Sequence, residues 1–201
     1  MEVSAVRVIA LAIAIVLLVS APALAAVPVN AAMVKAAQNY GRSQADMAMD
    51  VFLQPWTVYE EKAARLDETA ERACVYTPFL LIAADARDRA AAGGAVAAAD
   101  ADRVLGDYDG YVIIGVTLTV AQAAVFGDKY TASLRQDRKQ IRPGLVNAPQ
   151  APAGGGASPV QVQVFFYFPS AAVSLDRSAA LTVSAADGRQ RIFRVPFGEF
   201  R

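Results

Sequence analysis

The last third of the chain has the most regular alternation of hydrophobic and polar residues, which predicts β-strands. In VQVQVFFYFP, residues 160–169, the even-numbered positions are all Val or Phe, so this face should lie in the core. The odd-numbered face begins with two glutamines but continues with Phe165 and Tyr167. These two aromatic side chains are either covered by other parts of the chain or exposed to a partner, so we take them as the candidate partner patch.

Other segments in the second half predict further strands joined by turns. YVIIGVTLTV, residues 111–120, is a β-branched run with the length of one strand, and KYTASLRQ, residues 129–136, alternates apolar and polar side chains. Residues 180–197 predict a hairpin whose turn contains Asp-Gly, a strong short hairpin signal. The segment 148–159 is rich in Pro and Gly, so we expect a long loop there.

Helical patterns are concentrated in the first half of the chain. Helix-forming residues with a 3.6-residue apolar period predict an N-terminal helix within 27–50, and two shorter helices are expected at 78–92 and 96–105. Thr77 should cap the first of these shorter helices, because it precedes a proline at the first helical position. The segment MDVFLQPWTVY, residues 49–59, mixes β-branched and aromatic residues and predicts a strand interrupted by its proline.

Charged residues gather in two segments. YEEKAARLDETAERA, residues 59–73, mixes acidic and basic side chains at the spacing of ion pairs along an exposed helix, so we expect its carboxylates to be solvated. Near the C-terminus, Arg189, Arg191 and Arg194 could form a basic strip. Arginines on an exposed face are usually solvated, and that is the expectation for these three.

These elements together predict an α+β protein that is mainly β. We expect an antiparallel Ig-like β-sandwich with helical additions in the N-terminal half, since short alternating strands joined by hairpins favour two packed sheets. The likeness to Ig-like folds is architectural, because the Cys and Trp spacing of antibody domains is absent. The predicted organisation is a signal peptide at 1–26, a helix at 27–50 and a single domain at 51–201.

The N-terminus predicts export. Arg7 is followed by the apolar run 8–19 and then by small residues up to Ala25 and Ala26, which is the layout of a secretory signal peptide. A membrane-spanning helix needs roughly 20 apolar residues, which is longer than this run. Cleavage after Ala25 or Ala26 would leave no integral membrane span and would place the protein in the periplasm or outside the cell. An uncleaved anchor is the alternative, because Glu2 weakens the positive lead-in.

The amino-acid composition limits the partners and the reaction types that this protein can have. The chain has 19 basic and 19 acidic side chains, so it lacks the positive excess that favours nucleic acid or anionic membranes. It has no histidine, which excludes Ser-His-Asp and Cys-His nucleophile systems and the usual His-rich zinc or iron sites. We therefore predict no cofactor and no enzymatic activity, and a hydrolase that uses two carboxylates is the least favoured hypothesis.

Two local features remain as candidate sites. Cys74 is the single cysteine and cannot close an internal disulfide, so we expect a buried, unreactive thiol. In LGDYDGYVIIGV, residues 105–116, an EF-hand loop would need oxygen ligands at the first and twelfth positions, where this segment has leucine and valine. A turn at Asp109-Gly110 explains the pattern better, and Asp107 with Asp109 remains only a weak calcium candidate.

The sequence thus favours an exported, non-enzymatic binding or assembly module of the bacterial cell envelope. Its expected partner is an envelope protein or another surface component, since β-sandwiches are often used in this way. The alternative is a periplasmic carrier of a small apolar ligand or lipid, with a pocket beside Trp56, Phe79 and Phe166. The oligomeric state stays open.

Overall fold

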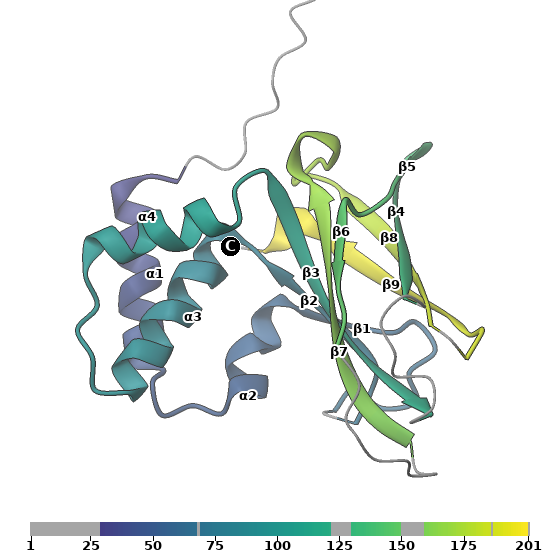
Figure 1. Ribbon diagram of the computed structural model, residues 1–201, viewed down its shortest axis with the longest axis horizontal. Coiled ribbons are helices and arrows are strands. Elements are labelled where there is room, and N and C mark those ends of the chain that lie inside the picture. Colours follow the sequence, from purple (N-terminus) through teal and green to yellow (C-terminus); the bar gives the residue numbers. More distant parts are fainter. Residues whose placement is uncertain (1–28, 68, 122–129, 150–158, 186, 201) are drawn as a thin grey trace, which may run out of the picture.

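The computed structural model describes residues 29–67, 69–121, 130–149, 159–185 and 187–200, which form an α+β protein that is mostly β. Two antiparallel sheets pack against each other around a shared core. The helices cover the face of one sheet that points away from the other (Figure 1). Sheet A contains, in spatial order, β1 (Thr57–Tyr59), β2 (Arg72–Tyr76), β3 (Tyr111–Ala121), β7 (Pro159–Pro169) and β6 (Leu145–Asn147). Sheet B contains β5 (Lys139–Ile141), β4 (Thr131–Gln136), β8 (Ser178–Ser184) and β9 (Gln190–Pro196).

The two sheets share one hydrophobic core, which confirms the alternation seen in the last third of the chain. Val164 and Phe166 of β7 are completely buried, and the antiparallel register places them opposite Val116 and Ile114 of β3. The two longest strands therefore present one apolar face to sheet B. On the other side of this inter-sheet core, buried residues such as Phe193 point inward from β9.

The predicted hairpin at 180–197 is confirmed. Strands β8 and β9 pair antiparallel, and Gly188 in their turn has a φ of +71°, which glycine adopts without strain. The Oδ1 atom of Asp187 accepts a hydrogen bond from the backbone N–H of Arg189 at 3.0 Å. A second hairpin joins β4 to β5, with Asp137 at a positive φ of 51° in its turn.

Four α-helices occur among the described residues, all of them before β3. They are α1 (Ala31–Ser43), α2 (Met49–Leu53), α3 (Pro78–Ala91) and α4 (Ala98–Asp107). The capping prediction is confirmed, because the Thr77 hydroxyl accepts a hydrogen bond from the backbone N–H of Leu80. At Gly41, a Cβ atom would lie 2.1 Å from the carbonyl oxygen of Ala83, so only glycine lets α1 and α3 approach this closely.

A second core, the helix–sheet core, lies between the helices and sheet A. Its aromatic members Tyr40, Phe52, Trp56 and Phe79 have ring centroids 5.7–6.4 Å apart. Phe52 and Trp56 are buried, and Cys74 of β2 belongs to the same core. This core explains why a helical layer rests on the outer face of sheet A.

The prediction of a strand at 49–59 is wrong for most of its length. Residues 49–53 form α2 and Gln54–Trp56 form a 3-10 helix, so only Thr57–Tyr59 is a strand. Phe52 and Trp56 are four residues apart and both enter the helix–sheet core, a spacing that suits a helix. The helix predicted within 27–50 also ends earlier, at Ser43, where a turn leads into α2.

The prediction of a charged helix at 59–73 is wrong as well. This segment contains the end of β1, a turn and the beginning of β2. The backbone N–H of Glu61 donates to the carbonyl of Ile192 at 2.9 Å, and Glu60 forms an isolated bridge with Phe193. The edge of sheet A is therefore joined to the edge of sheet B here, and this tertiary pairing replaces the local helix.

Some predictions fall on residues outside the described part. The signal peptide at 1–26 lies there, as does most of the Pro/Gly-rich loop, from 150 to 158. In the described ranges, no helix has the length and apolar character that a membrane span requires.

Candidate functional site

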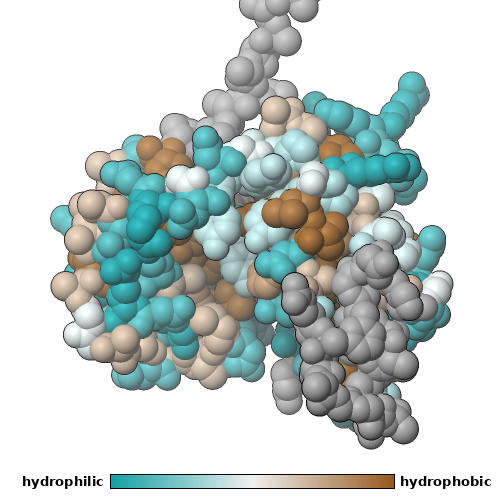
Figure 2. Space-filling model, in the orientation of Figure 1, coloured by the Kyte–Doolittle hydropathy of each residue, from teal (hydrophilic) through white to brown (hydrophobic). Residues whose placement is uncertain are grey.

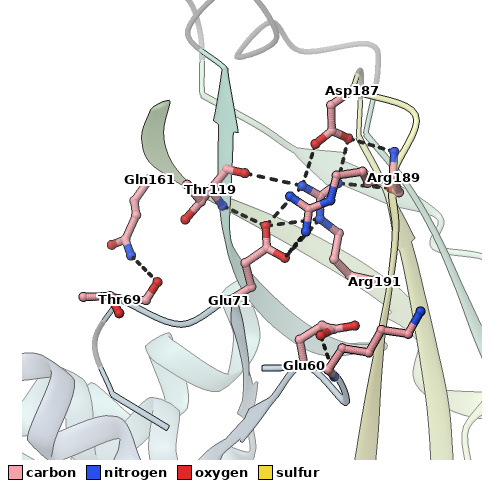
Figure 3. Close-up of polar contacts among 9 residues, drawn as sticks. Glu60, Thr69, Glu71, Thr119, Gln161, Asp187, Arg189 and Arg191 are labelled. Atoms are coloured by element: carbon pink, nitrogen blue, oxygen red, sulfur yellow. Dashed lines mark hydrogen bonds and ion pairs between the residues drawn. The ribbon is translucent and has the colours of Figure 1, made fainter. Parts of the chain in front are cut away.

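Arg191 forms a buried ionic clasp with Glu71 and Asp187 (Figure 3). The Arg191 side chain is 1% exposed, and its two terminal nitrogens donate to the two carboxylate oxygens of Asp187 at 2.7 Å each. On its other side, Nε and one terminal nitrogen donate to Glu71 at 3.1–3.2 Å. The expectation of a solvated Arg191 and a solvated Glu71 is therefore wrong, because both face the junction of the two sheets.

The clasp links sheet A to sheet B through the backbone of β3. The N–H of Thr119 donates to Glu71 at 3.1 Å, and the carbonyl of Thr119 accepts from Arg191 at 3.4 Å. Burial alone lowers the pKa of Arg191, but hydrogen bonds with Asp187 and Glu71 outweigh it and raise the pKa. Because these charged groups satisfy one another, the clasp is a structural link and leaves no open position for a ligand.

A groove of about 610 Å³ lies between α2 and the helix-facing side of sheet A; we call it the α2 groove. Three of its residues are large hydrophobic side chains that remain exposed: Met49 at 40%, Val51 at 49% and Leu66 at 70%. They come from α2 and from the turn between β1 and β2. Exposed apolar residues gathered beside a groove are typical of a binding surface.

The sheet side of the α2 groove is polar. It includes the side chains of Arg72, Thr117, Gln161 and Gln163, which lie on neighbouring strands β2, β3 and β7. Gln161 also donates to the carbonyl of Thr69 in the β1–β2 turn, at 3.4 Å (Figure 3). The groove thus combines apolar residues of α2 and the turn with hydrogen-bonding groups of the sheet.

Sequence reasoning missed the α2 groove, because it assigned Met49 and Val51 to a strand and Leu66 to a charged helix. One signal was present: the two glutamines face the helical side of a strand whose other face is entirely apolar. In the structure, the apolar residues Met49 and Val51 do not cover these glutamines completely, and a groove remains beside them.

Cys74 also lines the α2 groove, but its thiol is buried, as predicted. Burial raises the pKa of Cys74 to about 12, partly offset by a hydrogen bond with Thr57. The thiol therefore stays protonated at neutral pH and is a poor nucleophile.

Phe165 and Tyr167, the candidate partner patch, are both half-buried on the outer face of β7. The ring of Phe165 lies 5.7 Å from that of Tyr76, over Gly115, where a Cβ atom would be only 3.0 Å from either ring. Tyr167 meets Tyr111 edge to face at 6.0 Å. Each ring is thus partly covered by a neighbouring tyrosine of sheet A.

Beside this aromatic pair, part of the surface stays apolar. Figure 2 shows a hydrophobic area near the middle of the displayed face, where Figure 1 places β6, and Leu145 of β6 is exposed. Among the described residues, no contact shows what covers this area.

The calcium candidates Asp107 and Asp109 lie at the end of α4 and in the turn before β3. Gly110 has a φ of +79°, which agrees with the predicted turn at Asp109-Gly110. Asp107 instead pairs with Arg103, one turn earlier in α4, at 3.5 Å. Among the residues that the structure describes, no three His, Cys, Asp or Glu side chains come close enough to share a metal ion.

The pocket expected beside Trp56, Phe79 and Phe166 is not assembled. Trp56 and Phe79 stack in the helix–sheet core at 6.0 Å, whereas Phe166 is buried in the inter-sheet core. Sheet A separates the two sets of side chains, so the three aromatics do not line one cavity.

Comparisons with protein-family models, with curated proteins and with solved structures gave no significant match to this chain.

Proposed function

We propose that this protein is an exported, non-enzymatic binding module of the bacterial envelope, and that its α2 groove holds an extended segment of another envelope protein. The observation that carries the proposal is the combination of exposed Met49, Val51 and Leu66 with a polar sheet surface in one groove. Export is supported by the signal-peptide pattern at 1–26. A non-enzymatic role is supported by the histidine-free sequence and the protonated Cys74 thiol.

The polar side of the groove favours a peptide over a lipid. An acyl chain lying on Thr117, Gln161 and Gln163 would cover polar groups without replacing their hydrogen bonds to water, which costs free energy. A peptide backbone offers both N–H and C=O groups to such side chains. Its apolar side chains can at the same time contact Met49 and Val51. A lipid carrier is the second candidate, and the apolar residues of the groove alone support it.

The Ig-like description of the two sheets belongs to the same proposal. Among the described residues, nine strands in two antiparallel sheets around a shared core support it, and such folds commonly serve adhesion and assembly. The backbone link between Glu61 and β9 is a departure from two separate sheets. An experimental structure compared strand by strand with Ig-like domains tests this description.

Photo-crosslinking in intact source cells tests the binding role. A photoreactive phenylalanine analogue placed at Val51 should form adducts with one envelope protein, within one short segment of it. The matched control carries the analogue at Tyr111, which is similarly exposed but lies outside the groove. A synthetic peptide of the crosslinked segment should bind the purified protein, and Val51→Asp should weaken that binding about tenfold.

Val29→Asp is the control substitution, because Val29 is similarly exposed and lies outside the groove. Equal adducts from positions 51 and 111, or equal weakening by both Asp variants, would contradict the proposal. Lipid recovered from the purified protein and lost in Val51→Asp would favour the carrier instead. The N-terminus of the mature chain, measured in the same experiment, should lie near Ala26.

A further inference from the structure

Sheet B carries a second concave surface, of about 830 Å³, which we call the basic hollow. The residues that matter for its chemistry are Thr131, Ser133, Arg135, Arg142, Val146 and Thr182. They belong to β4, β8, β6 and the segment between β5 and β6. The lining contributed by described residues contains two arginines and no acidic side chain.

Arg135 and Arg142 differ from Arg177, Arg189, Arg191 and Arg194, and they share with Arg138 the lack of a carboxylate partner among the described residues. Arg177, Arg189 and Arg194 each form an ion pair with a carboxylate, and Arg191 forms the buried clasp. Within the described ranges, no carboxylate pairs with Arg135 or Arg142, and both are exposed. A cleft with positive charge of this kind attracts anionic groups, and guanidinium groups bind carboxylates in a bidentate manner.

The hollow also contains an accessible strand edge. Strand β5 pairs only with Leu134–Gln136 of β4, so on that side β4 is longer than its neighbour. Residues 131–133 pair with β8 on the other side, and no described strand pairs with their free edge. An unpaired strand edge is a template for an added strand, whose backbone supplies the hydrogen bonds.

Charge is distributed unevenly along the chain, although the total is zero. Residues 29–121 contain thirteen acidic and eight basic side chains, whereas residues 122–201 contain ten basic and five acidic ones. Both strands of the β4–β5 hairpin lie in the basic part. The basic hollow therefore belongs to the part of the chain with an excess of basic residues, which favours the approach of an acidic partner.

We propose that the basic hollow binds an acidic, extended segment of a partner protein, which adds as a strand to the free edge of β4 at 131–133. The backbone of the added segment hydrogen-bonds to β4, and its carboxylates pair with Arg135 and Arg142. Hydroxyl groups of Ser133 and Thr182 line the same hollow and can accept or donate to its polar groups. This site does not depend on the α2 groove, which lies on the helix-facing side of sheet A.

Binding of a labelled probe peptide to the purified, folded protein tests the proposal. The probe is an eight-residue peptide in which Glu alternates with Val, and a Lys–Val peptide is the charge control. We expect the Glu–Val peptide to bind, with an affinity that falls as salt is raised. The double variant R135E/R142E should weaken binding about tenfold or more, whereas R138E should change it little, because Arg138 carries the same charge but lies outside the hollow.

N-methylated probes separate strand addition from simple charge attraction. In an added strand, alternate backbone N–H groups point toward β4, so two peptides methylated on alternate amides should differ. We expect one of them to lose binding and the other to keep it. Equal binding of both, or no binding of the parent peptide, would overturn the proposal. So would a dimer that forms without peptide and disappears in R135E/R142E, because a second copy would then occupy the hollow.

Discussion

The inter-sheet core and the helix–sheet core lie on opposite faces of sheet A but are built in different ways. The inter-sheet core takes alternate residues from long strands, such as Val164 and Phe166 of β7 facing Val116 of β3. The helix–sheet core gathers aromatic side chains from segments far apart in the chain, including Phe52 and Phe79. The first depends on strand register, and the second on how separate helices dock.

The two regions also differ in whether their polar groups are paired within the protein or line an open groove. At the rim of the inter-sheet core, the clasp around Arg191 satisfies its charges within the protein. Beside the helix–sheet core, Gln163 and Thr117 line an open groove under α2. The closed region therefore contributes to stability, and the incompletely covered face of sheet A forms the groove to which we assign the proposed binding role.

The largest expected effect comes from removing one aromatic ring from each core. Phe166→Ala and Phe52→Ala should each lower the free energy of unfolding by about 3–5 kcal/mol, since both side chains are completely buried. Phe166→Ala should accelerate amide exchange in both sheets. Phe52→Ala should accelerate it chiefly in α1–α3, because helices docked by a few side chains open locally. Urea unfolding and hydrogen exchange measure the two quantities.

If Phe52→Ala exposed β8 and β9 to exchange as much as α1, the two cores would form one cooperative unit and the comparison would fail. Val29→Ala, at an exposed position outside both cores, serves as the control for nonspecific effects of truncation.

A smaller effect is expected from breaking the clasp. Glu71→Ala should lower the free energy of unfolding by about 3 kcal/mol, because Arg191 would then keep a buried charge with one partner removed. Arg194→Ala is the control, because Arg194 lies on β9, the same strand as Arg191. Arg194 is 82% exposed and pairs with Glu61, so its loss should cost about 0–1 kcal/mol. Equal losses of unfolding free energy in the two variants, measured by urea unfolding, would show that the buried clasp stabilises the fold no more than an exposed ion pair.

The smallest expected effect is on the pH dependence of stability. A hydrogen bond from Arg191 is the main cause that lowers the pKa of Asp187 below its usual value of 3.8. The folded state therefore favours the carboxylate, and this contribution is complete above about pH 4 and is lost as pH falls further. Asp187→Asn should flatten the decline of thermal stability between pH 4 and 2. An unchanged slope would show that other carboxylates control acid unfolding.

Several elements could be predicted from the sequence because local chemistry decides them. The even-numbered face of 160–169 is apolar and needs a core in any arrangement. Thr77 followed by proline starts α3 through a hydrogen bond within one turn. Gly188 supplies the positive φ of the β8–β9 turn. The burial of Cys74 follows from its place in an apolar strand.

Other elements were mispredicted because contacts between distant segments decide them. The charged segment 59–73 has the local pattern of a helix, but its backbone pairs with β9, more than 120 residues later. The same contact region brings Glu71 to Arg191. Strand β6 was not predicted at all, since three residues carry no period and its pairing with β7 alone makes it a strand.

Local sequence patterns were enough to establish the alternating strands, the hairpin turns, the helix start at Thr77 and the absence of histidine chemistry. Tertiary structure alone decided that Arg191 is buried, that Phe165 rests on Tyr76, and that an uncovered groove remains beside α2. The physical reason is distance along the chain. Hydrogen bonds and periodicity act over a few residues and can be recognised locally, whereas burial and charge pairing depend on which remote segments meet.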